Sequence, residues 1–304
     1  MLRLIATRLV IAIPTLFAVI TLTFIMIRLA PGSPFDGERP LDAPTRAALD
    51  AAYGINRPLL VQFGDYLSHI ARFDFGPSMV YRDFSVTQLV VQGLPVSLTL
   101  GGVALLLASM AGIASAVVAT RWSGGWPDAA LGALATILTA LPSFVSAPLL
   151  VLLFALTLGW LPVGGWGGVD HIVLPGVALA LPVAGAIHKL LRAALADQMR
   201  GDNIRTARAR GLTPFTIITR HALRPALIPV ASYLAPAAAG LLTGAVVIET
   251  IFALPGLGRY FVQGALNRDY PLVMAVVILY AALIILFNLL ADLAYGWLDP
   301  RIRG

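Results

Sequence analysis

Residues 9–27 read LVIAIPTLFAVITLTFIMI, a run of 19 uncharged residues between Arg8 and Arg28. A helix that spans a membrane needs about 20 mostly apolar residues, because the hydrocarbon core is about 30 Å thick. The run is longer than the apolar region of a usual signal peptide, and no small-x-small cleavage site follows it. These residues therefore predict an uncleaved first membrane span.

Four more uncharged runs are long enough to cross a bilayer, and a shorter run begins another span. The five further spans are predicted over 93–120, 129–158, 172–187, 225–248 and 271–291. We expect the short fourth span to continue as a helix through His188, Lys189 and Arg192 into the cytoplasm. The sequence thus predicts an all-α membrane protein with six transmembrane helices in a single domain, 1–304.

The composition agrees with a protein that lies in lipid. Hydrophobic residues make up 59% of the chain and charged residues 12%, whereas soluble domains carry about 25% charged residues. Basic cytoplasmic loops explain the net charge of +6, so the charge does not require a nucleic-acid partner. The chain has no cysteine, which excludes disulfides, thiolate metal sites and cysteine nucleophiles. The lipid bilayer is therefore the expected surrounding.

The charge of the loops predicts the orientation. The segment 189–224 carries eight basic residues and two acidic residues, whereas the Gly/Trp-rich segment 159–168 after the third span carries no Lys or Arg. The basic residues are Lys189, Arg192, Arg200, Arg205, Arg208, Arg210, Arg220 and Arg224. The positive-inside rule places the basic segment in the cytoplasm. Six spans then place both termini in the cytoplasm of a multi-pass protein of the cell (inner) membrane.

The segment 29–92 is expected outside the cell. Two short helices are predicted in it, Asp42–Tyr53 and Pro58–Phe73, the second with Leu59, Leu60, Phe63, Tyr66, Leu67 and Ile70 on one face. We expect this external segment to form a small cap on the membrane face.

The segment 201–230 reads GDNIRTARARGLTPFTIITRHALRPALIPV. Asp202 is predicted to cap a first helix that Gly211 ends at the C′ position. Thr213 is predicted to cap a second helix with Pro214 at its first position. Two capped helices around a glycine favour a surface that docks a cytoplasmic partner. The alternative, a basic loop that only sets the topology, stays open on these residues alone.

The motifs RTARARG, residues 205–211, and HALRPALIP, residues 221–229, resemble the EAA loop of ABC importer permeases. The form of the motif is similar to that of the dipeptide/oligopeptide/nickel class. Three further stretches share the resemblance in the same order along the chain: RLAPGSP at 28–34, VIETIFALPGLG at 247–258 and LDPRIR at 298–303. The resemblance covers nearly the whole sequence.

The resemblance implies a type I ABC importer permease fold and a set of partners. The partners are a second permease subunit, two cytoplasmic ATPase subunits and an extracytoplasmic substrate-binding protein. The resemblance favours a heterodimer of two different permeases. ATP and Mg would be bound by the ATPases, so no cofactor is expected in this chain. The expected substrate is a di- or oligopeptide or a related small solute, with nickel or another chelated solute as the alternative.

The same resemblance implies that the segment 189–224 couples this chain to the ATPases. The residues that carry the motif are Arg205, Thr206, Ala207, Arg208, Ala209, Arg210 and Gly211. We expect the three arginines to pair with acidic groups of the partner. We expect the two alanines to allow its close approach.

The motif at 247–258 contains the candidate gate. Glu249 lies at the end of the fifth span, and a carboxylate within a membrane is usually functional. The turn residues Pro255, Gly256 and Gly258 suggest a re-entrant turn at the translocation pathway, with an ordinary loop as the alternative. Asp292, at the end of the sixth span, is interpreted as an interfacial residue.

Catalysis by this chain itself is not expected. The only lysine, Lys189, follows His188, so the chain has no Gly-Lys-Ser/Thr of a P-loop. The four histidines are scattered and predict no metal site. An intramembrane enzyme and a secondary transporter are the alternative classes. Neither a catalytic set within the spans nor an inverted repeat is visible.

Overall fold

The computed structural model describes residues 2–29, 44, 56–81 and 83–298. The predicted helix Asp42–Tyr53 lies outside the described residues, as do most of the motifs at 28–34 and 298–303 and the side chain of Asp292. Within the described residues the regular elements are all helical, and one isolated bridge joins Pro77 and Ser85.

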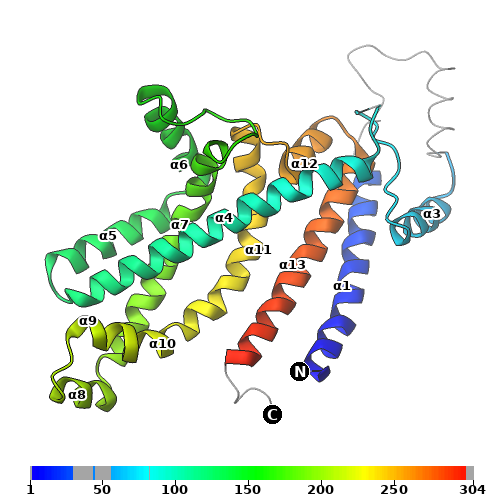
Figure 1. Cartoon of the computed structure of the whole chain (residues 1–304). Helices are drawn as coiled ribbons and strands as arrows, with labels where there is room; N and C mark the ends of the chain where they lie inside the picture. The colour runs from blue at the N-terminus through cyan, green and yellow to red at the C-terminus, as the bar shows by residue number, and fades with distance from the viewer. Residues whose placement is uncertain (1, 30–43, 45–55, 82, 299–304) are drawn as a thin grey trace.

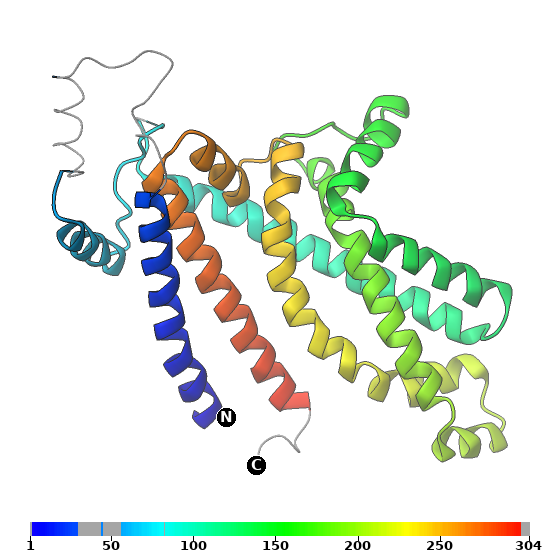
Figure 2. The same cartoon turned by 180° about the vertical axis from the view of Figure 1, so that it is seen from behind.

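Five helices of the described chain are long and apolar enough to cross a membrane, and they coincide with five of the six predicted spans. They are α1 (Leu2–Leu29), α4 (Val86–Arg121), α7 (Asp170–Gln198), α11 (Ile228–Ile251) and α13 (Tyr270–Leu298). Helices α1, α13 and α11 stand side by side, and α4 starts near the upper end of α13 and runs obliquely across α11 and α7 (Figures 1 and 2). As predicted, α7 continues as one helix well beyond residue 187.

The third predicted span is broken in two. Helix α5 (Trp126–Ala140) is followed by α6 (Ser143–Leu150) and the π-helical η1 (Val151–Thr157), and the two parts are bent by 106°. Leu141 has extended backbone and precedes Pro142. A proline disfavours helical geometry in the residue before it. Counting the bent pair as one span gives six spans, but the run 129–158 is not one continuous helix.

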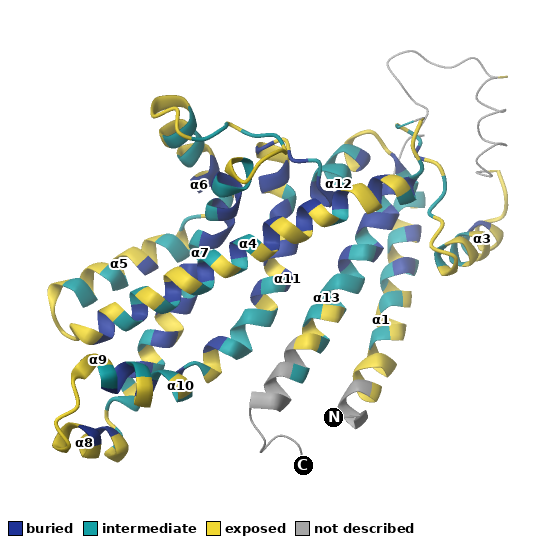
Figure 3. Cartoon of the chain, viewed as in Figure 1, coloured by how far each residue is buried: buried dark blue, intermediate teal, exposed yellow. Residues whose placement is uncertain are grey.

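Close contacts between helices hold α7 at the centre of the fold. A Cβ on Gly112 of α4 would lie 2.7 Å from the Ile187 Cβ, and one on Gly185 of α7 would lie 2.6 Å from the Ala135 carbonyl oxygen. Small residues allow such approaches between helices in lipid. The main core is accordingly formed by α4, α7 and α11, and Figure 3 shows buried residues concentrated on these helices.

Short helices lie at the two ends of the bundle. At the end where α1 begins and α13 finishes lie α8 (Asp202–Ala209), α9 (Pro214–Thr216), the π-helical η2 (Ile217–Ala222) and α10 (Leu223–Ala226) (Figure 1). Toward the opposite end lie α6, α12 (Leu257–Leu266) and α3 (Leu59–Ala71). Helix α3 confirms the predicted helix at 58–73. The described parts of the segments 189–224 and 29–92 thus lie at opposite ends of the bundle, and their placement on the two sides of the membrane stays a prediction.

Candidate functional site

The turn around Gly211 has the geometry that the sequence predicts. Gly211 has a φ of +78°, and its N–H donates to the Arg208 carbonyl oxygen at 2.9 Å. The N–H of Leu212 donates to the Ala207 carbonyl oxygen at 3.3 Å. A residue with a side chain is strained at such a φ, so glycine is the natural end of α8.

The second predicted cap is confirmed and the first is wrong. The Thr213 hydroxyl accepts a hydrogen bond from the Thr216 N–H at 3.3 Å, with Pro214 at the first helical position. Helix α8, in contrast, is preceded by Gly201 and has no side-chain cap. Asp202 is instead the first residue of α8, where its carboxylate faces Arg205 at 3.4 Å. An acidic residue is favoured there by the helix dipole, without capping geometry.

The segment between α7 and α11, residues 199–227, packs onto its own chain. It contains most of the predicted coupling segment 189–224, whose first residues belong to α7, and we call it the coupling loop after the role that the resemblance implies. Helix α8 packs on η2, and η2 and α10 pack on α7. Ile204, Ile217 and Ile218 are buried in the main core, which also contains Leu191 and Leu195 of α7. Burying such side chains contributes about 1.5–3 kcal/mol each. The coupling loop is therefore packed as an extension of α7.

This packing changes the interpretation of Ala207. Ala207 is 5% exposed and belongs to the same core. It therefore packs inside the chain and does not offer a contact to a partner, contrary to the expectation from sequence. Its small side chain instead allows α8 to approach the rest of the coupling loop. Ala209, on the other face of α8, is exposed as expected.

The exposed face of the coupling loop is basic with an apolar neighbour. Arg205, Arg208 and Arg210 are exposed, as is Thr206. Phe215, just beyond the turn, is 60% exposed. An exposed aromatic residue next to arginines is typical of the residues that dominate protein interfaces.

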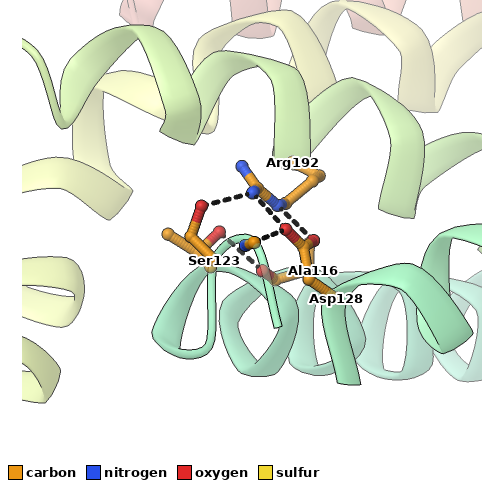
Figure 4. Close-up of polar contacts among 6 residues, drawn as sticks. Ala116, Ser123, Asp128 and Arg192 are labelled. Carbon is orange, nitrogen blue, oxygen red and sulfur yellow. Dashed lines mark hydrogen bonds and ion pairs between the residues drawn. The ribbon is translucent and has the colours of Figure 1, made fainter. Parts of the chain in front are cut away.

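An ion pair joins α7 to the first turn of α5 (Figure 4). Arg192 donates from Nε to Asp128 Oδ1 at 2.8 Å and from Nη2 to Asp128 Oδ2 at 2.7 Å. Nη2 also donates to the Ser123 hydroxyl at 2.9 Å, and the Gly124 N–H donates to Asp128 Oδ2 at 3.0 Å. Both charged side chains are 19% exposed. Such a bidentate pair fixes both position and orientation.

Two residues near Arg192 make further polar contacts from α7 to the neighbouring helices. Lys189 donates to the Thr139 hydroxyl of α5 at 2.7 Å, and His188 Nδ1 lies 2.9 Å from the Ser115 hydroxyl of α4. Sequence reasoning counted Lys189 and Arg192 only as loop charges. His188 and Arg192 are four residues apart, which places their side chains on one face of a helix. This spacing could have indicated a polar face of α7 that points into the bundle.

Glu249 and Ser97 form a buried polar cluster at the opposite end of the bundle. Glu249 and Ser97 are each 0% exposed. The Ser97 hydroxyl donates to Glu249 Oε1 at 2.6 Å, and the N–H groups of Gly258 and Arg259 donate to Oε2 at 2.7 and 3.3 Å. Ser97 Oγ also accepts from the Leu257 N–H at 2.9 Å. The carboxylate thus satisfies the free amides at the start of α12.

The two glycines of this motif are needed because the backbone approaches the carboxylate closely. A Cβ on Gly256 would overlap the Glu249 carboxylate, and one on Gly258 would overlap the Cα of Val246. Pro255 lies in the turn that leads into α12. The structure brings Glu249, Gly256 and Gly258 together, and it adds Ser97, which sequence reasoning missed because it lies on α4.

The family model described as "Binding-protein-dependent transport system inner membrane component" matches residues 90–304, well over half of the chain. The chain belongs to this family. It is therefore an inner-membrane component of an ABC importer, and the fold and family expected from the sequence motifs are confirmed.

Relatives and solved structures support this assignment. The oligopeptide transport system permease protein OppB of Salmonella typhimurium is 48% identical to this permease over 310 residues and covers all of both chains. The dipeptide transport system permease protein DppB of Bacillus subtilis is 42% identical over 289 residues, or 95% of this chain and 94% of DppB. The inward-facing MetNI methionine ABC transporter matches with a TM-score of 0.61 at 19% identity, over 70% of this chain and 97% of that one, which shows the fold.

Membership of this family assigns the permease a non-catalytic role in transport. Importers of this type combine permease, ATPase and binding-protein components, and ATP hydrolysis belongs to the ATPase. Among the described residues, no group of three or more His, Cys, Asp or Glu side chains is placed to hold a metal ion.

Proposed function

We propose that this chain is the permease subunit of an ATP-driven importer of di- or oligopeptides and forms half of the translocation pathway. The full-length similarity to OppB and DppB, at 48% and 42% identity, supports the peptide class. The observation that carries the mechanism is the rigid packing of the coupling loop on α7, with its arginines exposed.

The proposed partner of the coupling loop is a cytoplasmic ATPase that binds ATP and Mg. Arg205, Arg208 and Arg210 would pair with acidic groups in a groove of that ATPase, and Ala209 and Gly211 would let its surface approach. Since α8 is packed against η2, η2 and α10 against α7, and α7 against α4 and α5, a displacement of α8 moves the bundle. Movement of a rigid element between two packed arrangements is a common form of conformational switching.

The complete importer would contain a second, similar permease, two ATPases and an extracytoplasmic binding protein. In this arrangement both termini and the coupling loop lie in the cytoplasm, and α3 and α12 lie outside. A heterodimer is favoured because the resemblance is to a class that pairs two different permeases.

Glu249, Pro255, Gly256 and Gly258 are proposed to act at the outer gate. The Glu249 carboxylate joins α11 to the start of α12 and, through Ser97, to α4. Helices α4, α11 and α12 all contact this polar cluster. When the outer end of the pathway opens, these helices would have to move together or break its hydrogen bonds. In this role the carboxylate holds the gate elements and does not contact the substrate.

Uptake by the reconstituted importer tests the peptide assignment. The permease is placed in proteoliposomes with its partner permease, ATPases and binding protein. ATP-dependent uptake of a radiolabelled tripeptide is then compared with that of nickel and of a nickel–histidine chelate. We expect uptake of the tripeptide only. Uptake of nickel or its chelate without the tripeptide would replace the peptide assignment, and tripeptide uptake by the permease alone without ATP would contradict the ABC mechanism.

A further inference from the structure

A cavity of about 330 Å³ lies between α1, α3 and the start of α13, at the end of the bundle opposite the coupling loop. We call it the α3 cavity. Its polar lining comes from Arg28 of α1, from Arg57, and from Gln62, Asp65, Tyr66 and His69 of α3. It lies far from the coupling loop and is not lined by any residue of the Glu249 cluster. It therefore belongs to neither candidate site described above.

The lining of the α3 cavity carries an excess positive charge. Arg57 Nη1 pairs with Asp65 Oδ2 at 3.1 Å, so these two charges offset each other. Arg28 is half-buried and lies over the Phe24 ring at 5.5 Å. No carboxylate of the described residues pairs with Arg28. A half-buried cation is favoured by an anionic partner, which leaves the cavity suited to an anion.

A neutral hydroxyl belongs to the same lining. Tyr66 lines the α3 cavity, and its hydroxyl has no hydrogen-bond partner among the described residues. Burial raises the pKa of the Tyr66 phenol above its ordinary value, so the group remains a neutral hydroxyl. The Arg28 guanidinium suits the oxygen atoms of a phosphate group, and the buried Tyr66 hydroxyl adds a polar, uncharged part to the wall of the cavity.

The position of the cavity relative to the membrane indicates where the anion comes from. Arg28 follows directly after the 19 uncharged residues 9–27, so its guanidinium lies at the level where lipid headgroups begin. Helix α3 lies beside α1 near this level (Figure 2), with the Phe63 ring 5.1 Å from that of Phe24.

Helix α3 also exposes apolar side chains beside the α3 cavity. Leu60 is 85% exposed, and Leu59 and Val61 are 59% and 47% exposed. A helix with an apolar exposed part and polar neighbours lies in the interface plane of a bilayer. A soluble phosphate ion would gain nothing from these side chains, whereas acyl chains would cover them.

We propose that the α3 cavity binds the phosphate of an anionic phospholipid in the outer half of the bilayer, with Arg28 as the charged contact. The acyl chains lie along Leu59 and Leu60. This inference is independent of the substrate of the importer and of the role of the coupling loop.

Native mass spectrometry of the intact importer tests the proposal. The complex is purified in mild detergent and incubated with dioleoylphosphatidylglycerol or dioleoylphosphatidylcholine, and the lipid retained on the permease is measured. We expect phosphatidylglycerol to be retained over phosphatidylcholine. Arg28→Gln should lower its retention about fivefold, whereas Arg28→Lys should keep most of it. Arg72→Gln, an exposed arginine of the same surface outside the α3 cavity, is the matched control.

A second variant separates lipid binding from folding. Leu60→Ser changes a residue that is 85% exposed, so the fold should remain intact while retention of the lipid falls. Equal retention in the Arg28→Gln and Arg72→Gln complexes overturns the proposal. So does equal retention of the two lipids, or displacement of phosphatidylglycerol by millimolar inorganic phosphate, which would assign the site to a free anion.

Discussion

Arg192 on α7 and Asp128 at the start of α5 form a bidentate ion pair across 64 residues of sequence, with N–O distances of 2.8 and 2.7 Å. Ser123 and Gly124 complete the arrangement from the turn before α5. Arg192 lies only a few residues before the end of α7 at Gln198, from which the coupling loop begins. The pair therefore joins the base of the coupling loop to the α4–α5 turn.

Breaking this pair should destabilise the permease. Arg192→Met leaves the Asp128 carboxylate without its charged donor, and hydrogen bonds to charged groups contribute about 1.5–3 kcal/mol. We expect a lower midpoint of thermal unfolding and a lower ratio of peptide transported to ATP hydrolysed. Arg72→Met, an exposed arginine of the segment between α1 and α4, should change neither.

The double variant Asp128→Arg/Arg192→Asp supplies the control for a specific pair. It should recover part of the lost stability and coupling, although not the Gly124 hydrogen bond. If the double variant is no better than Arg192→Met, the two side chains do not act as a pair.

Gly258→Ala should destabilise the end of the bundle that holds Glu249. The added Cβ overlaps the Cα of Val246 and crowds the Glu249 carboxylate, and overpacking of this kind costs about 1–3 kcal/mol. Unfolding in a denaturant series, followed by tryptophan fluorescence, measures the change. Gly240→Ala on α11 has no atom within 4 Å of the new Cβ and should be neutral or slightly stabilising. Similar effects of the two substitutions would argue against the close approach at Gly258.

Charge reversal on the exposed face of α8 should uncouple the importer. Arg208→Glu places a negative charge where an acidic ATPase surface is proposed to bind, and loss of one partner of such a pair weakens association by about tenfold or more. The permease should still fold, since Arg208 is exposed. Copurification of the ATPase and ATP-driven uptake measure the effect. Arg72→Glu, on the external segment, is the control, and wild-type ATPase recovery with Arg208→Glu would contradict the docking role.

Ala207 and Ala209 should respond differently to a larger side chain. Ala207→Leu inserts atoms into the core between α8 and the rest of the coupling loop, and we expect a cost of about 1–3 kcal/mol in stability. Ala209→Leu lies on the exposed face and should leave stability unchanged while weakening ATPase association. Thermal unfolding of the permease and ATPase copurification separate the two effects. Loss of stability in Ala209→Leu alone would reverse the assignment of the two faces.

The orientation can be measured by labelling single cysteines, because the native chain contains no cysteine. Arg210→Cys and Trp160→Cys both replace exposed residues, and Trp160 is 69% exposed. A membrane-impermeant maleimide should label Cys at 160 in intact cells and Cys at 210 only in inverted vesicles. The opposite pattern would invert the proposed topology.

Local patterns were sufficient to predict much of this fold. The apolar run 9–27 and four of the other runs became long helices, and Gly211 and Thr213 occupy the turn and cap positions that their side chains favour. These features depend on the chain within one or two helical turns, and lipid requires each span to satisfy its own backbone hydrogen bonds. The break between α5 and α6 also has a local cause, the effect of Pro142 on Leu141. It was missed because the long apolar run 129–158 was interpreted as one span.

Contacts between distant segments decided the rest. Whether Ala207 faces a partner or the interior depends on where η2 packs, and the roles of Arg192 and Glu249 depend on Asp128 and Ser97, which are 64 and 152 residues away. The sequence alone does not distinguish a solvated basic side chain from one in an ion pair. Apolarity and turn chemistry are properties of a short segment, so they determined the spans and the helix–turn–helix of the coupling loop. Burial and ion pairing are properties of neighbours, so only the packed structure determined the tie to α7, the cluster at α12 and the α3 cavity.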